Sequence, residues 1–129
     1  MIIVDSSVWI DLFNNARSRE TEILAHLVRR RMLAVGDLIL TEVLQGARTD
    51  AHFAEIRSRL SRLELYAMGG HDVAVRSARN YRELRRRGIT VRKTIDVIIA
   101  TFCIEHGHTL LHSDRDFDLM REPLGLVTL

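Results

Sequence analysis

The sequence contains one cysteine and one proline among its 129 residues. With Cys103 alone, no intramolecular disulfide can form, which fits a reducing compartment and a buried, inert thiol. With Pro123 alone, no proline-rich linker can separate domains, and we expect one domain over residues 1–129. No apolar run approaches the ~20 residues of a transmembrane helix, and the opening MIIVDSS lacks the basic leader of a signal peptide. We therefore expect a cytoplasmic protein with no membrane association.

Short apolar runs alternate with segments of helical periodicity. The expected strands are MIIVD, LELYAM, HTLLHS and the terminal LGLVTL. The first expected helix follows Ser6-Ser7, and the next ones cover residues 18–33, about 41–47 and 50–63. A further helix runs from Gly70 to Gly88, another covers residues 94–106, and a short helix follows HTLLHS. This alternation predicts an α/β fold, in which helices flank a central, mainly parallel sheet.

Four acidic residues fall at the ends of these elements. Asp5 ends the first strand, and Asp114 lies just past HTLLHS. Asp96 and Glu42 are expected in the first turns of two helices. Sites in open α/β sheets form beyond the carboxyl ends of the strands, so this topology could bring the four acids to one edge. Taken singly, each acid also has an ordinary explanation as a helix cap, a favourable charge at a helix N-terminus, or a turn residue.

Asp96 is the acid that these structural explanations serve least well. It precedes the apolar segment VIIATFCI, and only Arg92 and Lys93 lie near it in the sequence as cations. A buried carboxylate needs compensation, and Mg²⁺ or Mn²⁺ can hold several carboxylates together. The pattern therefore favours a divalent metal site.

Other metal sites do not fit the spacing. DRDFD opens like a calcium-binding EF-hand loop, but Leu119 and Gly125 replace the required glycine and glutamate. His106, His108 and His112 have no accompanying cysteine for zinc. We expect these histidines to be structural or exposed, with the last two in a strand.

The stretches IIVDSSVWIDLF, LTEVLQGA, KTIDVIIATFCIEHGHTLLHSDRDFD and GLVTL resemble the PIN-domain ribonucleases, specifically the VapC-type toxins of toxin–antitoxin pairs. The resemblance implies a PIN-like parallel sheet whose acids meet in a negatively charged pocket. The family's acidic quartet is matched by Asp5, Glu42, Asp96 and Asp114. Asp116 matches a frequent additional acid, which binds through water or supports Asp114, and Asp118 resembles a surface or capping residue.

The resemblance also implies an activity and partners. Mg²⁺ or Mn²⁺, held by Asp5, Asp96 and Asp114, would activate water to hydrolyse RNA and leave 5′-phosphates. Glu42 would orient a water. Ser6 would form a hydrogen bond to a carboxylate or to the scissile phosphate, or would cap its own helix. The implied partners are an RNA substrate, a cognate antitoxin and a second copy in a homodimer. Apolar residues between 20 and 63 could make those protein contacts or simply pack the core.

Basic residues offer a route for RNA, because 18 of the 19 are arginine and Lys93 is the sole lysine. Arginine pairs bidentately with phosphate, although genome base composition also produces such a bias. The candidate phosphate contacts on one helix face are Arg76, Arg79, Arg82 and Arg86, with Arg85, Arg87, Arg92 and Lys93 nearby. A solvated face with salt bridges to Glu83 explains them equally well. Aromatic residues make up only 5%, which favours recognition of RNA shape and backbone over base stacking.

Two alternatives remain open at this point. A housekeeping RNA-processing nuclease would use the same fold and acids. A non-catalytic domain, either a Mg²⁺-binding phosphoacceptor receiver or a binding module, is the other. A receiver would have paired acids after the first strand and a late lysine in the sheet, whereas Asp5 stands alone and Lys93 precedes a helix.

Overall fold

Four short strands form one sheet in the computed structural model, which describes residues 1–129. The strands are β1 (Ile2–Val4), β2 (Leu33–Gly36), β3 (Glu64–Tyr66) and β4 (Thr109–Leu111). Their order is β3-β2-β1-β4, and every pairing is parallel, with Ile3 opposite both Ala34 and Leu110. The expected α/β architecture with a parallel sheet is confirmed.

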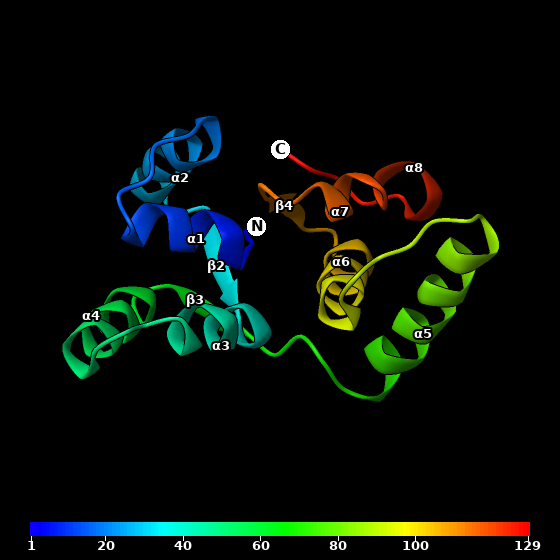
Figure 1. Ribbon diagram of the computed structural model, residues 1–129, viewed down its shortest axis with the longest axis horizontal. Helices are drawn as coiled ribbons and strands as arrows, with labels where there is room; N and C mark the ends of the chain where they lie inside the picture. Colours follow the sequence, from blue (N-terminus) through cyan, green and yellow to red (C-terminus); the bar gives the residue numbers. More distant parts are fainter.

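Helices make the crossovers that parallel strands require. They are α1 (Ser6–Phe13), α2 (Arg19–Arg30), α3 (Asp37–Gln45), α4 (Asp50–Leu60), α5 (His71–Arg86), α6 (Thr94–His106), α7 (Arg115–Asp118) and α8 (Arg121–Leu124). In Figure 1, α1 and α2 lie on one side of the sheet, and α5 and α6 lie on the other. None of these helices has both the length and the apolar character needed to cross a membrane.

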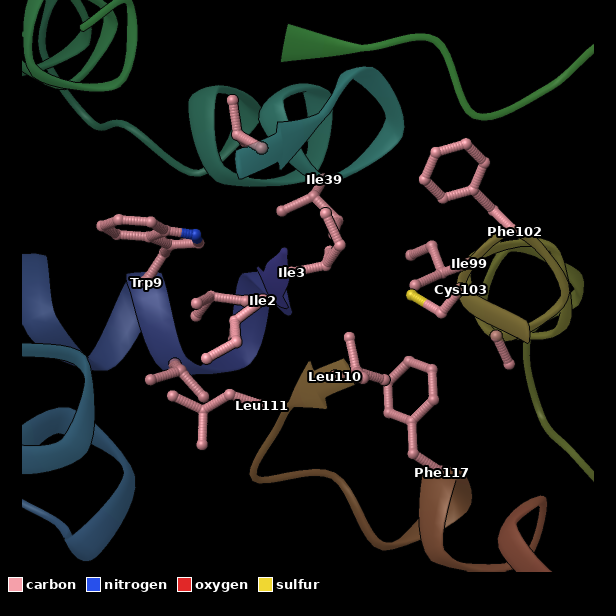
Figure 2. Packing of buried hydrophobic residues seen from close by; sticks show 14 of the residues in the cluster. Ile2, Ile3, Trp9, Ile39, Ile99, Phe102, Cys103, Leu110, Leu111 and Phe117 are labelled. Atoms are coloured by element: carbon pink, nitrogen blue, oxygen red, sulfur yellow. The ribbon is translucent and has the colours of Figure 1, made fainter. Parts of the chain in front are cut away.

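The core forms around β1, one of the two strands, with β2, that have neighbours on both sides. Ile3 and Val4 are completely buried, as expected for a continuously apolar strand of a parallel sheet. Figure 2 shows Trp9 of α1 on one side of Ile3 and Cys103 of α6 on the other. Cys103 is completely buried, as expected of a core cysteine, and this burial raises the pKa of its thiol to about 12.

One strand was not expected from the sequence. Residues 18–33 were predicted as one helix, but α2 ends at Arg30, and Arg31 turns into the left-handed region with φ of 54°. The chain then enters β2, whose four residues are all buried. Because Gly36 closes this strand, the next helix begins at Asp37 and is longer than the predicted segment 41–47.

Two predictions about the last strands need correction. LGLVTL does not form a strand, since after Gly125 (φ 81°) it makes only an isolated bridge between Thr128 and Leu110. His108 and His112 flank β4 instead of lying within it. The position of the two histidines follows from the shortness of β4, which has only three residues.

Gly36 provides a test of how tightly β2 packs. A Cβ at Gly36 would collide with Sδ of Met68, which is completely buried. We expect Gly36→Ala to lower the free energy of unfolding by about 1–3 kcal/mol, the usual cost of overpacking. Urea denaturation measures this, with Gly69→Ala as the control because nothing lies within 4 Å of that position. Equal stability of Gly36→Ala and the wild type would contradict close packing here.

Candidate metal centre

The acidic residues gather where the order of the sheet reverses. The chain builds β2 on one side of β1 and returns to add β4 on the other side. Asp5 directly follows β1, and Asp114 follows β4 and caps α7. The carboxyl ends of two adjacent parallel strands at such a switch point form a crevice that commonly holds ligands.

Asp5 divides its two carboxylate oxygens between two roles. Oδ2 accepts hydrogen bonds from the backbone N–H of Ser7 at 3.1 Å and from the Ser7 hydroxyl at 2.6 Å, which caps α1. Oδ1 is buried and has no hydrogen-bond partner. Burial raises the pKa of Asp5 although the Ser7 hydrogen bonds oppose this. The capping explanation therefore accounts for only one of the two oxygens.

Asp96 lies in the first turn of α6, as predicted, and is only 3% exposed. Its Oδ2 is buried without a hydrogen-bond partner. Burial, followed by the negative charges of Asp5 and Asp114, raises the pKa of Asp96 to about 7. Lys93 opposes the shift but is outweighed. A carboxylate in this position would be strongly stabilised by a cation.

Asp96, Asp114 and Asp116 form the acidic cluster, because each offers an oxygen and these oxygens all lie within 4.8 Å of one another. Asp114 Oδ1 accepts a hydrogen bond from the backbone N–H of Asp116 at 3.0 Å. Asp116 is 6% exposed, so two of the three acids are buried. The structure thus brings the predicted pair Asp96 and Asp114 together with the additional acid.

Arg92 bridges two members of the acidic cluster. Its Nε donates to Asp116 Oδ2 at 3.1 Å, and its Nη2 lies 3.5 Å from Asp114 Oδ1. The Arg92 side chain is 68% exposed, so the pair is screened by water on one side. The hydrogen bond to Asp116 raises the pKa of Arg92. Sequence reasoning considered Arg92 as a phosphate contact and missed this role, for which the only signal was its closeness to Asp96.

Glu42 lies near Asp5, and neither of them belongs to the acidic cluster. Because α3 begins at Asp37, Glu42 sits in its second turn, and the prediction of a first-turn position is wrong. Its Oε1 accepts a hydrogen bond from the Ser6 hydroxyl at 3.2 Å. Burial and the charge of Asp5 raise the pKa of Glu42. Ser6 therefore uses its hydroxyl on a carboxylate, one of the uses expected of it.

Ser7 is a residue that sequence reasoning treated only as part of a helix start. Its hydroxyl donates to Asp5 and also accepts from the backbone N–H of Ser113 at 3.2 Å. One hydroxyl thus ties the end of β1 to the segment leading to Asp114. The sequence DSS carries no signal for this contact, because Ser113 is 106 residues away.

The remaining candidates lie outside the acidic cluster. The Asp118 side chain is 58% exposed and 3.4 Å from His112 Nε2. His112 packs against Phe117, and His106 stacks on Phe102 with 4.5 Å between ring centroids. These positions fit the expected surface aspartate and structural histidines.

A surface hollow of about 610 Å³ gives Asp114, one member of the acidic cluster, access to solvent. Asp114 forms part of its wall. The basic residues in this wall are Arg19, Arg115 and Arg121. An anionic ligand could therefore approach Asp114 alongside arginine side chains, provided that the carboxylates are neutralised.

The donor set suits a hard divalent cation. All candidate ligand atoms are carboxylate oxygens, which Mg²⁺ and Mn²⁺ prefer. The unpartnered buried oxygens of Asp5 and Asp96 lack the hydrogen bonds that buried polar atoms normally make. The residues present therefore fit such an ion.

Comparisons with known proteins identify the family and the fold. The PIN domain family model matches residues 2–123. VapC ribonuclease Mb1587 of Mycobacterium bovis is 32% identical over 127 residues, covering 93% of this chain and 91% of the relative. DNA-bound VapBC from Salmonella typhimurium superposes with a TM-score of 0.78 at 20% identity, over 99% of this chain and 96% of that chain. A toxin–antitoxin complex from Klebsiella pneumoniae superposes with a TM-score of 0.72 at 24% identity, over 99% of this chain and 97% of that chain.

The structural matches share the fold, and the sequence matches cover most of the chain. The resemblance seen in the motifs around Asp5, Glu42, Asp96 and Asp114 is thereby confirmed at the level of the family. The chain belongs to the PIN-domain family, with VapC ribonucleases among its relatives.

Proposed function

We propose that this protein is a metal-dependent endoribonuclease that hydrolyses RNA phosphodiester bonds. The observation that carries the proposal is Asp96, a buried acid with an unpartnered oxygen beside Asp114 and Asp116. The 32% identity to a VapC ribonuclease supports RNA as the substrate. The whole chain, residues 1–129, would then act as one nuclease domain.

The proposed ion is Mg²⁺ or Mn²⁺, held by Asp5, Asp96 and Asp114. When bound, such an ion supplies an activated water and neutralises charge on the phosphate. The unpartnered Oδ1 of Asp5 and Oδ2 of Asp96 are available for this purpose. Asp116 is fixed by Arg92 through Oδ2, so we assign it a supporting role.

The other residues of the site would orient the reactants. Ser7 fixes the carboxylate of Asp5 through two hydrogen bonds. Ser6 fixes Glu42 in the same way through one. The raised pKa of Glu42 makes its carboxylate a stronger hydrogen-bond acceptor. We therefore assign Glu42 the role of positioning the attacking water. The family quartet would thus be divided between three metal-holding acids and one that orients water.

We further propose that the chain is the toxin of a type II toxin–antitoxin pair in the cytoplasm. The solved relatives include a toxin–antitoxin complex, which supports an antitoxin partner for this chain. Homodimer formation is part of the proposal. A housekeeping RNA-processing role would use the same residues, and a receiver-like domain lacks support because the chain belongs to the PIN family.

Asp96→Asn tests the catalytic assignment. We expect the variant to lose more than about 100-fold in RNA cleavage rate, since even outer partners of metal ligands are worth 10–100-fold. Cleavage of labelled RNA should require Mg²⁺ or Mn²⁺, stop in EDTA and leave 5′-phosphates. Circular dichroism checks that the variant folds, and Asp118→Asn is the matched control in an exposed position. Cleavage that survives both EDTA and Asp96→Asn would exclude the metal mechanism.

The raised pKa of Asp96 predicts a pH-dependent response to metal. Below about 7 its carboxyl is largely protonated, so an ion must displace the proton. We expect Mn²⁺ to raise the melting temperature more at pH 8 than at pH 6, and neither shift to occur in Asp96→Asn. Differential scanning fluorimetry measures this, and a shift of equal size at both pH values would contradict the assignment.

Without metal, the same pKa has the opposite consequence. The folded protein holds the Asp96 proton more tightly than the unfolded chain, so the stability contributed by this group falls as the pH rises from the ordinary pKa of 3.8 to about 7, and it stays level above that. The difference in free energy of unfolding between the wild type and Asp96→Asn isolates that contribution. Urea denaturation in EDTA at several pH values across this range measures it. A difference that is constant with pH would show that Asp96 has an ordinary pKa.

Growth arrest separates the toxin from a housekeeping nuclease. We expect induced expression of the wild type in a bacterial host to stop growth, because an uninhibited toxin cleaves cellular RNA. Expression of Asp96→Asn at the same level should not. Normal growth with active wild-type enzyme present would favour the housekeeping role.

A further inference from the structure

The outer face of α5 carries a group of arginines without acidic partners. The inner face of the helix packs against the rest of the protein through Val73, Ser77 and Leu84, which are buried. In Figure 1, α5 is the outermost helix on its side of the sheet. Its opposite face is therefore open to solvent, and it is the face that carries the arginines.

A hollow of about 450 Å³ on this face is lined only by charged residues. They are Arg79, Arg82, Glu83, Arg85 and Arg86. Glu83 is already engaged by Arg86 and by Arg87, whose Nε lies 2.9 Å from its carboxylate. Salt bridges thus explain those two arginines and Arg76, which pairs with Glu105 at 3.1 Å. They leave three cations unexplained.

The three remaining cations, Arg79, Arg82 and Arg85, make no salt bridge within 4.0 Å. Three cations brought together at one hollow repel each other, so an anion placed among them is favoured electrostatically. No apolar residue lines the hollow, whereas the centre of a protein interface normally contains apolar and aromatic side chains. These features favour a polyanion over a folded protein.

The position of this face relates it to the acidic cluster. The C-terminal end of α5 connects through residues 87–93 to the first turn of α6, which holds Asp96. Arg92 in this connection contacts Asp114 and Asp116. At the same end, Arg87 reaches Glu122 of α8 at 3.6 Å. A chain of phosphates crossing the acidic cluster can therefore continue onto α5.

We infer that the α5 arginine face, formed by Arg79, Arg82 and Arg85, is a second binding site that holds the RNA backbone away from the cleaved bond. This inference rests on the proposed ribonuclease function. Recognition is by phosphate charge, so the site raises affinity for long RNA without selecting bases. A substrate too short to reach α5 gains nothing from it.

The test is binding of fluorescein-labelled polyuridine to the full chain in EDTA, followed by anisotropy over a range of salt concentrations. We compare the wild type with the triple variant Arg79→Gln/Arg82→Gln/Arg85→Gln. The matched control is Arg29→Gln/Arg30→Gln/Arg57→Gln, which removes three exposed, unpaired arginines of α2 and α4 and changes the net charge equally. Circular dichroism and thermal melting verify folding of both variants.

We expect the α5 variant to bind RNA about 10-fold more weakly at low salt. Its slope of log affinity against log salt should be shallower by about 2, because each lost phosphate contact contributes about 0.7 to the slope. The control should keep the wild-type slope. With Mn²⁺ added, KM for long RNA should rise in the α5 variant, whereas cleavage of a UpU dinucleotide should be unchanged.

Equal losses in the α5 variant and the control, or no loss in either, would overturn the second site. If the wild type also cleaves RNA, the ribonuclease function still stands. If the wild type cleaves no RNA but only the α5 variant loses RNA binding, the second binding site would stand and the proposed ribonuclease activity would be overturned. Displacement of the RNA by polyglutamate at equal charge concentration would assign the face to an acidic peptide and overturn RNA as its ligand.

Discussion

The burial of negative charge at the carboxyl ends of β1 and β4 is the constraint around which this site is arranged. Asp5, Asp96 and Asp116 are all less than a tenth exposed, and Asp114 lies beside them. Each carboxylate loses hydration on folding and is repelled by its neighbours, and hydrophobic burial elsewhere must offset both costs. Hydrogen bonds from Ser7 and the Asp116 amide stabilise part of this charge. A divalent cation would stabilise the remainder.

Capping and ligand binding are compatible here because a carboxylate has two oxygens. Asp5 uses one oxygen to cap α1, and Asp114 uses one to cap α7. The cap fixes the side-chain rotamer and points the second oxygen in a defined direction, which is the preorganisation that a metal site needs. The helix cap and the functional residue, which looked like competing explanations in the sequence, would be two roles of the same side chain in the proposed site.

The sequence predicted the acids better than it predicted their surroundings. Asp5 and Asp96 could be identified because strand ends and an apolar helix are visible as local patterns. The strand β2 was missed, because its apolar residues continue the helical spacing of α2 and only the left-handed Arg31 separates the two. The contacts of Arg92 and Ser7 could not be predicted, since they join residues 24 and 106 positions apart. Such contacts depend on the register of the sheet, and no local pattern encodes that register.

Arg92 has a consequence for the order of events during protein synthesis. Its guanidinium already contacts two acids of the cluster, so the charges there are partly balanced by a group that is covalently part of the chain. This internal cation lowers the electrostatic cost of forming the native state before any metal ion binds. For the metal site proposed above, folding and metal loading would then be separate steps, and the concentration of free divalent ions would determine when the site is complete without determining whether the protein folds.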